Sequence, residues 1–167
     1  MKYILVAMES EAAYLTCPQD HIILTGIGVQ NIIMTLGALL ETKKIKRTDT
    51  FLNVGYAGSC RYHIGEVLSI AHVDKFIKPT AIEEGAFDLE PLTPNHTLCY
   101  TFDDFAENVD CEGVMDMELF YLACFFPNLH ALKIVSDNGN YAQYERFDAD
   151  AAWTKANKVI QTFLKGH

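Results

Sequence analysis

The stretch YILVAMESEA, residues 3–12, places two glutamates, Glu9 and Glu11, directly after an apolar run. The apolar run, residues 3–7, predicts a strand that is buried on both faces, as strands of parallel sheets are. In such sheets, ligands bind at the carboxyl ends of the strands. The two carboxylates therefore lie where the sequence predicts a binding site, at the exit of the first strand.

The rest of the chain alternates between short apolar runs, which predict strands, and apolar residues at helical spacing. Strands are expected at 21–25, 50–56, 66–73, 97–102 and 130–135, and helices at about 32–40, 118–126 and 153–164. Residues 75–97 contain three prolines and are expected to form a loop with little regular structure. This order predicts one α/β domain, residues 1–167, with three layers: a central mixed sheet, mostly parallel, and helices on both of its faces.

The composition limits the kinds of molecule that the protein is expected to bind. The formal net charge of -9 argues against binding of nucleic acid or of an anionic membrane, which requires a basic surface. No apolar run approaches the ~18 residues that span a bilayer, and the N-terminus lacks the pattern of a signal peptide. The five cysteines include no CxxC pair and show no metal-ligand spacing with the histidines. We therefore expect reduced thiols in the cytoplasm, no metal and no cofactor.

Two further motifs point to chemistry only weakly. GIGVQN, residues 26–31, follows a predicted strand and precedes a helix, as the dinucleotide fingerprint does, but Asn31 stands at the third glycine position. The glycine pair still allows close approach of a ligand to the backbone at a helix N-terminus. Cys60 and His63 lack a third group to orient them, so a packed thiol and a surface histidine are favoured over a nucleophilic pair.

Five short segments follow predicted strands or precede predicted helices. They are AMESEA (7–12), TGIG (25–28), NVGYAGSCRYHIGEV (53–67), VMDMELFYLA (114–123) and KIVSDN (133–138). In this order they resemble the purine nucleoside phosphorylase and nucleosidase superfamily, and most closely its methylthioadenosine/S-adenosylhomocysteine nucleosidase branch. The resemblance implies the nucleoside phosphorylase-like fold and hydrolysis of the N-glycosidic bond of a purine nucleoside. It also implies a homodimer in which a neighbour closes the pocket for the 5′ substituent.

The resemblance implies a catalytic pair. Glu11 matches the glutamate that activates the attacking water, and Asp137 matches the aspartate that protonates the purine ring. Ser136 matches the neighbour that orients this aspartate, and Glu9 is expected to be a solvated or capping neighbour of Glu11. Acid and base are the natural catalysts here, because breaking the bond develops positive charge on the ribose and negative charge on the base.

The resemblance also implies a set of substrate contacts. Met117 and Glu118 match the pair that holds the ribose, with Glu118 accepting from the sugar hydroxyls. Phe105 matches the aromatic residue that stacks on the base. The other residues expected to bind substrate are Gly55, Tyr56, Ala57 and Lys133.

Several alternatives remain open at this point. Phosphorolytic relatives carry phosphate-binding arginines where this chain has Asn53 and the acidic segment MESE, so water is favoured over phosphate as the nucleophile. Tyr56 stands where the nucleosidases have a small hydroxyl residue. Lys133 stands where they have an arginine; it keeps the positive charge but lacks the planar guanidinium group that makes paired hydrogen bonds. The alternatives are a phosphorylase, a nucleoside-binding protein without turnover, and a partner-binding protein with a vestigial pocket.

Overall fold

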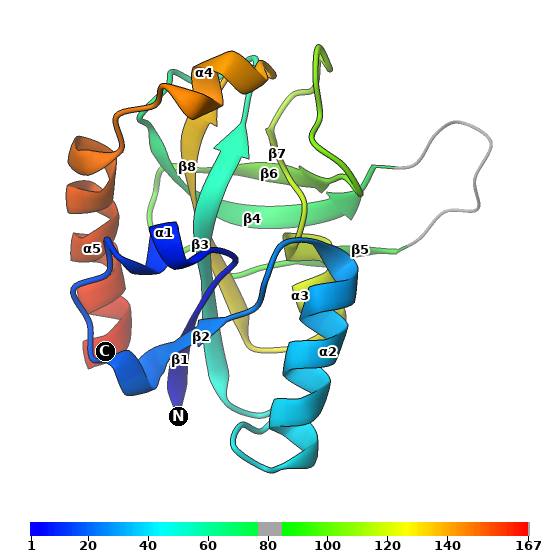
Figure 1. Cartoon of the computed structure of the whole chain (residues 1–167), viewed down its shortest axis with the longest axis vertical. Helices are drawn as coiled ribbons and strands as arrows, with labels where there is room; N and C mark the ends of the chain where they lie inside the picture. The colour runs from blue at the N-terminus through cyan, green and yellow to red at the C-terminus, as the bar shows by residue number, and fades with distance from the viewer. Residues whose placement is uncertain (77–84, 167) are drawn as a thin grey trace.

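The computed structural model describes residues 1–76 and 85–166, in which strands and helices alternate along the chain (Figure 1). Its strands are β1 (Lys2–Val6), β2 (Ile22–Leu24), β3 (Thr50–Gly58), β4 (Val67–Lys75), β5 (Ala86–Asp88), β6 (His96–Thr101), β7 (Val114–Asp116) and β8 (Leu129–Asp137). Its helices are α1 (Glu9–Ala12), the 3-10 turn η1 (Gln19–His21), α2 (Gly28–Glu41), α3 (Leu119–Phe125), α4 (Tyr141–Glu145) and α5 (Asp150–Lys165).

The strands form one mixed sheet. β1 lies between β2 and β3, and β3 continues to β8, with all of these neighbours parallel. β8 is antiparallel to β4, which pairs in parallel with β6 and antiparallel with β5. β7 is parallel to β6 and meets β3 where Gly58 pairs with Met115, so the sheet curls back on itself. Because β1, β3 and β8 run in parallel, their carboxyl ends meet at one edge.

The sheet separates two hydrophobic cores, and alternate residues of a strand belong to different cores. In β1, Tyr3 and Leu5 share a core with α2 and α3, whereas Ile4 and Val6 share the other core with α5. Trp153 of α5 is only 1% exposed, so this helix is anchored firmly on its face of the sheet. Helices thus cover both faces, and the predicted three-layer α/β fold is confirmed (Figure 1).

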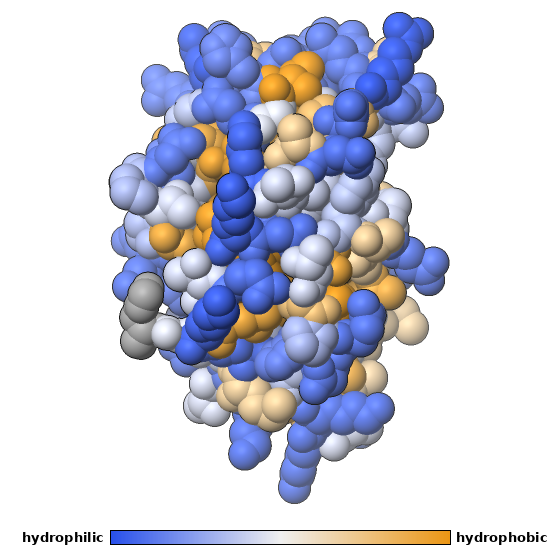
Figure 2. Space-filling view, turned by 90° about the vertical axis from the view of Figure 1, so that its left-hand side faces the viewer, coloured by the Kyte–Doolittle hydropathy of each residue, from blue (hydrophilic) through white to orange (hydrophobic). Residues whose placement is uncertain are grey.

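Helix α5 is amphipathic, because its buried residues belong to one hydrophobic core while many of its other residues are exposed. Seen from the side on which α5 lies, hydrophilic residues dominate the surface and apolar residues show between them (Figure 2). Within the described ranges, no helix is both long enough and apolar enough to cross a membrane.

The sequence did not predict four of the short elements, α1, α4, β5 and β7. β5 and β7 have three residues each, α1 has four and α4 has five, so they are too short for a hydrophobic pattern to repeat several times. β5 falls inside the segment 75–97, and the expectation of a loop is wrong for residues 86–88, which pair with β4. Residues 77–84 of that segment lie outside the described part of the chain.

Candidate active site

The carboxyl ends of β1, β3, β7 and β8 surround a cavity of about 360 Å³. Its wall combines a largely apolar lining with carboxylates, at the edge of the sheet where the sequence predicted a site. The lining residues with a polar side-chain group are Glu11, Tyr56, Asp116, Glu118, Ser136, Asp137, Tyr141 and Tyr144. The others are Ala7, Met8, Ile27, Ala57, Gly58, Phe105, Ala106, Met115 and Met117.

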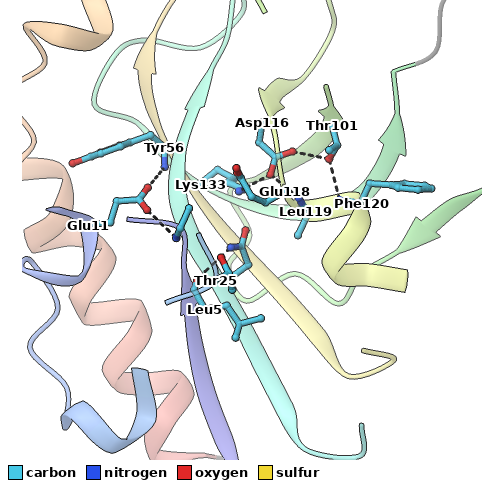
Figure 3. A network of polar contacts seen from close by, with 12 residues as sticks. Leu5, Glu11, Thr25, Tyr56, Thr101, Asp116, Glu118, Leu119, Phe120 and Lys133 are labelled. Carbon is cyan, nitrogen blue, oxygen red and sulfur yellow. Dashed lines mark hydrogen bonds and ion pairs between the residues drawn. The ribbon is translucent and has the colours of Figure 1, made fainter. Parts of the chain in front are cut away.

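Glu11 lies on α1, the short helix that follows β1, and is only 2% exposed. Its Oε2 accepts hydrogen bonds from the backbone N–H groups of Ala7 (3.1 Å) and Met8 (3.0 Å). Its Oε1 accepts a third from the backbone N–H of Tyr56 on β3, at 3.1 Å (Figure 3). Because an ionised carboxylate offers about four acceptor sites, Oε1 keeps one for a further donor such as water.

The environment of Glu11 makes it a stronger base. Burial raises the pKa of this carboxyl, and the three backbone hydrogen bonds and the ammonium of Lys133 offset part of the effect. β3 leaves space for the carboxylate at Gly55, where a Cβ would lie 2.9 Å from Oε1. A side chain at that position would displace Glu11, so Gly55 acts on the site through Glu11.

Asp137 ends β8, on the other side of β3, and is 1% exposed. Its Oδ2 accepts a hydrogen bond from the Ser136 hydroxyl, and its Oδ1 accepts one from the backbone N–H of Gly139, both at 2.8 Å. A Cβ at Gly58 would lie 2.8 Å from Oδ1. Both carboxylates are therefore seated against glycines of β3, which has a bulge between Ala57 and Gly58 along its pairing with β8.

Glu118 immediately precedes α3 and is 9% exposed. Its Oε1 accepts a hydrogen bond of 3.2 Å from the backbone N–H of Gly28, the first residue of α2. Burial and the neighbouring carboxylate of Asp116 raise the pKa of Glu118 to about 7, although Lys133 and the Gly28 N–H oppose this shift. Near neutral pH this carboxyl can therefore change its protonation state. Met117 lines the cavity beside it.

Lys133 differs from its expected role, because it does not line the cavity. Its ammonium lies 2.7 Å from Oδ2 of Asp116, and both side chains are almost completely buried (Figure 3). Asp116 also accepts hydrogen bonds from the Thr101 hydroxyl (2.6 Å) and the backbone N–H of Leu119 (2.9 Å). Burial alone would lower the pKa of Lys133, but Asp116 and other acidic neighbours raise it, so the lysine stays protonated.

Aromatic rings complete the wall. Phe105, which was expected to stack on the base, lies edge-on to Tyr141 of α4, with 5.4 Å between the ring centroids. Tyr144 of α4 stands beside both rings. Tyr56 packs edge-on against Trp153 of α5, and its hydroxyl accepts a hydrogen bond of 2.8 Å from the indole N–H. The ring of Tyr56 thus packs on α5, while the backbone N–H of Tyr56 donates a hydrogen bond to Glu11.

The structure brings most of the predicted site residues together. Those that line the cavity are Glu11, Tyr56, Ala57, Phe105, Met117, Glu118, Ser136 and Asp137. Sequence reasoning missed Asp116 and the two tyrosines of α4. A cap was the available signal for α4, because Asn140 accepts a hydrogen bond from the backbone N–H of Gln143 at its N-terminus. In the described part of the chain, no cluster of histidine, cysteine and carboxylate side chains is arranged to hold a metal.

Several solved structures share this fold. The 5′-methylthioadenosine/S-adenosylhomocysteine nucleosidase of Helicobacter pylori is similar with a TM-score of 0.75 and 14% identity, over 98% of this chain and 97% of that chain. Futalosine hydrolase of Helicobacter pylori gives a TM-score of 0.75 and 14% identity, over 98% and 97%. S-adenosylhomocysteine nucleosidase of Streptococcus pyogenes is similar with a TM-score of 0.73 and 19% identity, over 98% of this chain and 95% of that chain. No family model and no curated protein matches the sequence.

The fold defines the chain as an α/β protein of the nucleoside phosphorylase-like class. Within this class, it has the fold of the methylthioadenosine/S-adenosylhomocysteine nucleosidases, which confirms for the fold the resemblance seen in the sequence. Identities of 14% and 19% establish a common fold, so the function is argued from the site itself.

Proposed function

We propose that this protein is a nucleosidase that hydrolyses the N-glycosidic bond of a purine nucleoside similar to methylthioadenosine or S-adenosylhomocysteine. One observation carries the proposal: two buried carboxylates, Glu11 and Asp137, line one cavity from opposite sides of β3. Both accept hydrogen bonds from uncharged donors, which are backbone N–H groups and the hydroxyl of Ser136. Buried carboxylates without a cationic partner are costly, and they concentrate at sites of chemistry.

The proposed reaction divides the work between these two residues. Glu11 takes a proton from water, and the water oxygen forms a bond to the anomeric carbon of the ribose. The bond from that carbon to the base nitrogen breaks, its electron pair passes to the base, and Asp137 supplies the proton that neutralises the base. Ser136 holds Asp137 through the 2.8 Å hydrogen bond, and Glu118 accepts from the sugar hydroxyls when it is ionised.

The charge of the cavity supports water over phosphate as the nucleophile. Among the described residues that line it, the side chains with a carboxyl group are Glu11, Asp116, Glu118 and Asp137, and none of the lining residues is a lysine, arginine or histidine. A phosphate anion would meet carboxylates instead of the guanidinium or ammonium groups that bind it. The same carboxylates stabilise a ribose that becomes positively charged in the transition state.

A chromatographic assay of base release tests this function. The purified protein is incubated with methylthioadenosine, S-adenosylhomocysteine, adenosine and inosine, each with and without phosphate. We expect free base at the same rate in both conditions. Release that requires phosphate would support a phosphorylase, and calorimetric binding without release, unchanged in Glu11→Gln, would support a non-catalytic nucleoside-binding protein.

We further propose a homodimer, because apolar side chains are exposed at the start of α2 and along it. Ile27 lines the cavity and is 47% exposed, and Ile33 and Met34 of α2 are 52% and 75% exposed. Light scattering coupled to size-exclusion chromatography tests this, and a monomer at micromolar concentration would contradict it.

We also propose a cytoplasmic location, supported by the five cysteines, all of them in the described ranges and none in a disulfide.

A further inference from the structure

The phenol of Tyr144 faces the cavity with a weak hydrogen-bond partner. Tyr144 lies on α4, lines the cavity, and is braced by the edge of the Tyr56 ring at 6.0 Å between centroids. In the described part of the chain, the acceptor of its hydroxyl is the thioether sulfur of Met8, at 3.7 Å. A thioether is a poor acceptor, so an oxygen or nitrogen of a ligand would replace it favourably.

The same hydroxyl stays a donor in the presence of three carboxylates. Burial raises the pKa of Tyr144, and Glu11, Asp137 and Glu118 add to the shift. The phenol is therefore protonated at any pH at which the protein would work. It does not donate to any of these three carboxylates, whose donors are named above. Its proton is available to a ligand that lies between them.

The position of Met8 indicates which end of a nucleoside the hydroxyl meets. Met8 follows β1 and Asp137 ends β8, and these strands flank β3 on opposite sides. If Asp137 marks the base and Glu118 the ribose, the Met8 side of the cavity receives the end of the nucleoside that points away from the base. That end carries the 5′ substituent.

We propose that Tyr144 is a specificity residue that donates a hydrogen bond to an oxygen on the 5′ carbon of the substrate. The inference also changes one part of the proposed substrate. The site would favour a purine nucleoside with an oxygen acceptor on the 5′ carbon over methylthioadenosine and S-adenosylhomocysteine, because the thioether sulfur that these carry there is a poor acceptor. This inference rests on the proposed function, because it uses the orientation that Asp137 and Glu118 give to the nucleoside.

Adenosine and 5′-deoxyadenosine test the inference, because they differ only in the 5′ oxygen. Their dissociation constants are measured by calorimetry, and their rates by base release, for the wild type and for Tyr144→Phe. We expect Tyr144→Phe to weaken adenosine binding about three- to tenfold, the effect of one neutral hydrogen bond, and to leave 5′-deoxyadenosine within twofold. Tyr62→Phe is the matched control, because it removes a phenol that donates to Thr97 (2.8 Å) outside the cavity.

The outcomes separate this inference from the proposed function. Equal weakening of both nucleosides, or no change for either, in a Tyr144→Phe protein with a wild-type melting temperature would overturn the role of Tyr144 while leaving the nucleosidase intact. Binding of both nucleosides by the wild type without base release would refute the catalytic proposal, and the affinity ratio would still decide the role of Tyr144. Absence of binding to the wild type would overturn both.

Discussion

Among the carboxylates that line the cavity, Glu11 and Asp137 differ from Asp116 in the groups that hold them. Glu11 and Asp137 are 2% and 1% exposed and accept hydrogen bonds from backbone N–H groups and one hydroxyl. Asp116 is similarly buried, at 5%, but it pairs with the ammonium of Lys133. The two regions therefore bury the same chemical group with and without a countercharge.

This difference distinguishes the two carboxyl groups proposed to be catalytic, Glu11 and Asp137, from the structural carboxylate of Asp116. The ammonium of Lys133 pairs with Asp116, and Thr101 and Leu119 donate hydrogen bonds to the same carboxylate, so the protein itself holds this group. Neutral donors position Glu11 and Asp137 while leaving acceptor capacity for water or a ligand. We therefore expect substitutions of Glu11 and Asp137 to change rates, and substitutions in the ion pair of Lys133 and Asp116 to change stability.

Asp137→Asn should give the largest effect on rate. An amide cannot donate a proton to the leaving base in the way a carboxylic acid can, and loss of general acid catalysis costs about 10²–10⁴-fold in rate. Steady-state rates of base release from adenosine measure this loss. Nucleosides with activated leaving groups need less protonation and should lose less, so an equal loss on both kinds of substrate would indicate a positioning role.

Glu11→Gln should reduce turnover by a similar order, about 10²–10⁴-fold, with affinity for the nucleoside kept within several-fold. The amide still fits against Gly55 but cannot take a proton from water. Since burial raises the pKa of Glu11 and the base must be ionised, the rate of the wild type should fall as the pH drops through that raised pKa. A variant with wild-type turnover would show that the base lies elsewhere.

Lys133→Met should destabilise the fold by about 3–5 kcal/mol, because it leaves the buried Asp116 carboxylate without its cation. Urea denaturation measures the change in the free energy of unfolding. Replacement of both partners, Lys133→Met with Asp116→Leu, should restore part of the stability, because no unpaired charge then remains. A single variant within about 1 kcal/mol of the wild type would contradict a structural role for the pair.

The sequence was sufficient for the central strands because they are continuous apolar runs. β1, β3 and β8 lie within the sheet, so their residues are buried on both faces, and their exits carry the residues of the cavity. β7 was not predicted because it has only three residues and is separated from α3 by only two residues, so it shows no repeating pattern of its own. α4 escaped because its five residues bury none of their side chains.

The ion pair could not be predicted for a different reason. Lys133 stands in an apolar strand, and nothing in the local pattern shows whether its ammonium reaches the cavity or a partner. That partner, Asp116, lies on β7, which pairs with β6 and touches β3 at one point. The pair depends on how the sheet curls, which local periodicity does not encode. The resemblance gave Lys133 a substrate contact, whereas the geometry gives it Asp116.

Glu118→Gln should weaken binding of ribosides by about 1.5–3 kcal/mol, the contribution of a hydrogen bond to a charged acceptor, and affect free adenine less. The pKa of Glu118 is raised to about 7, so the group becomes ionised as the pH rises through neutrality. Riboside affinity of the wild type should therefore increase from pH 6 to pH 8, and Glu118→Gln should lack this increase. Calorimetry at both pH values measures it, and a parallel loss of adenine affinity would rule out a ribose-specific role.

Glu9→Gln should have the smallest effect, although it lies two residues from Glu11 on the same short helix. Glu9 is exposed and does not line the cavity, and surface substitutions usually change stability by less than about 0.5 kcal/mol. Paired with Glu11→Gln in the base-release assay, it makes the same chemical change on the outer side of α1. If Glu9→Gln were inactive and Glu11→Gln active, the assignment of the catalytic base would shift by two residues. The cavity would then need a different orientation of α1, because Glu11 is the residue whose carboxylate accepts the N–H of Tyr56 from β3.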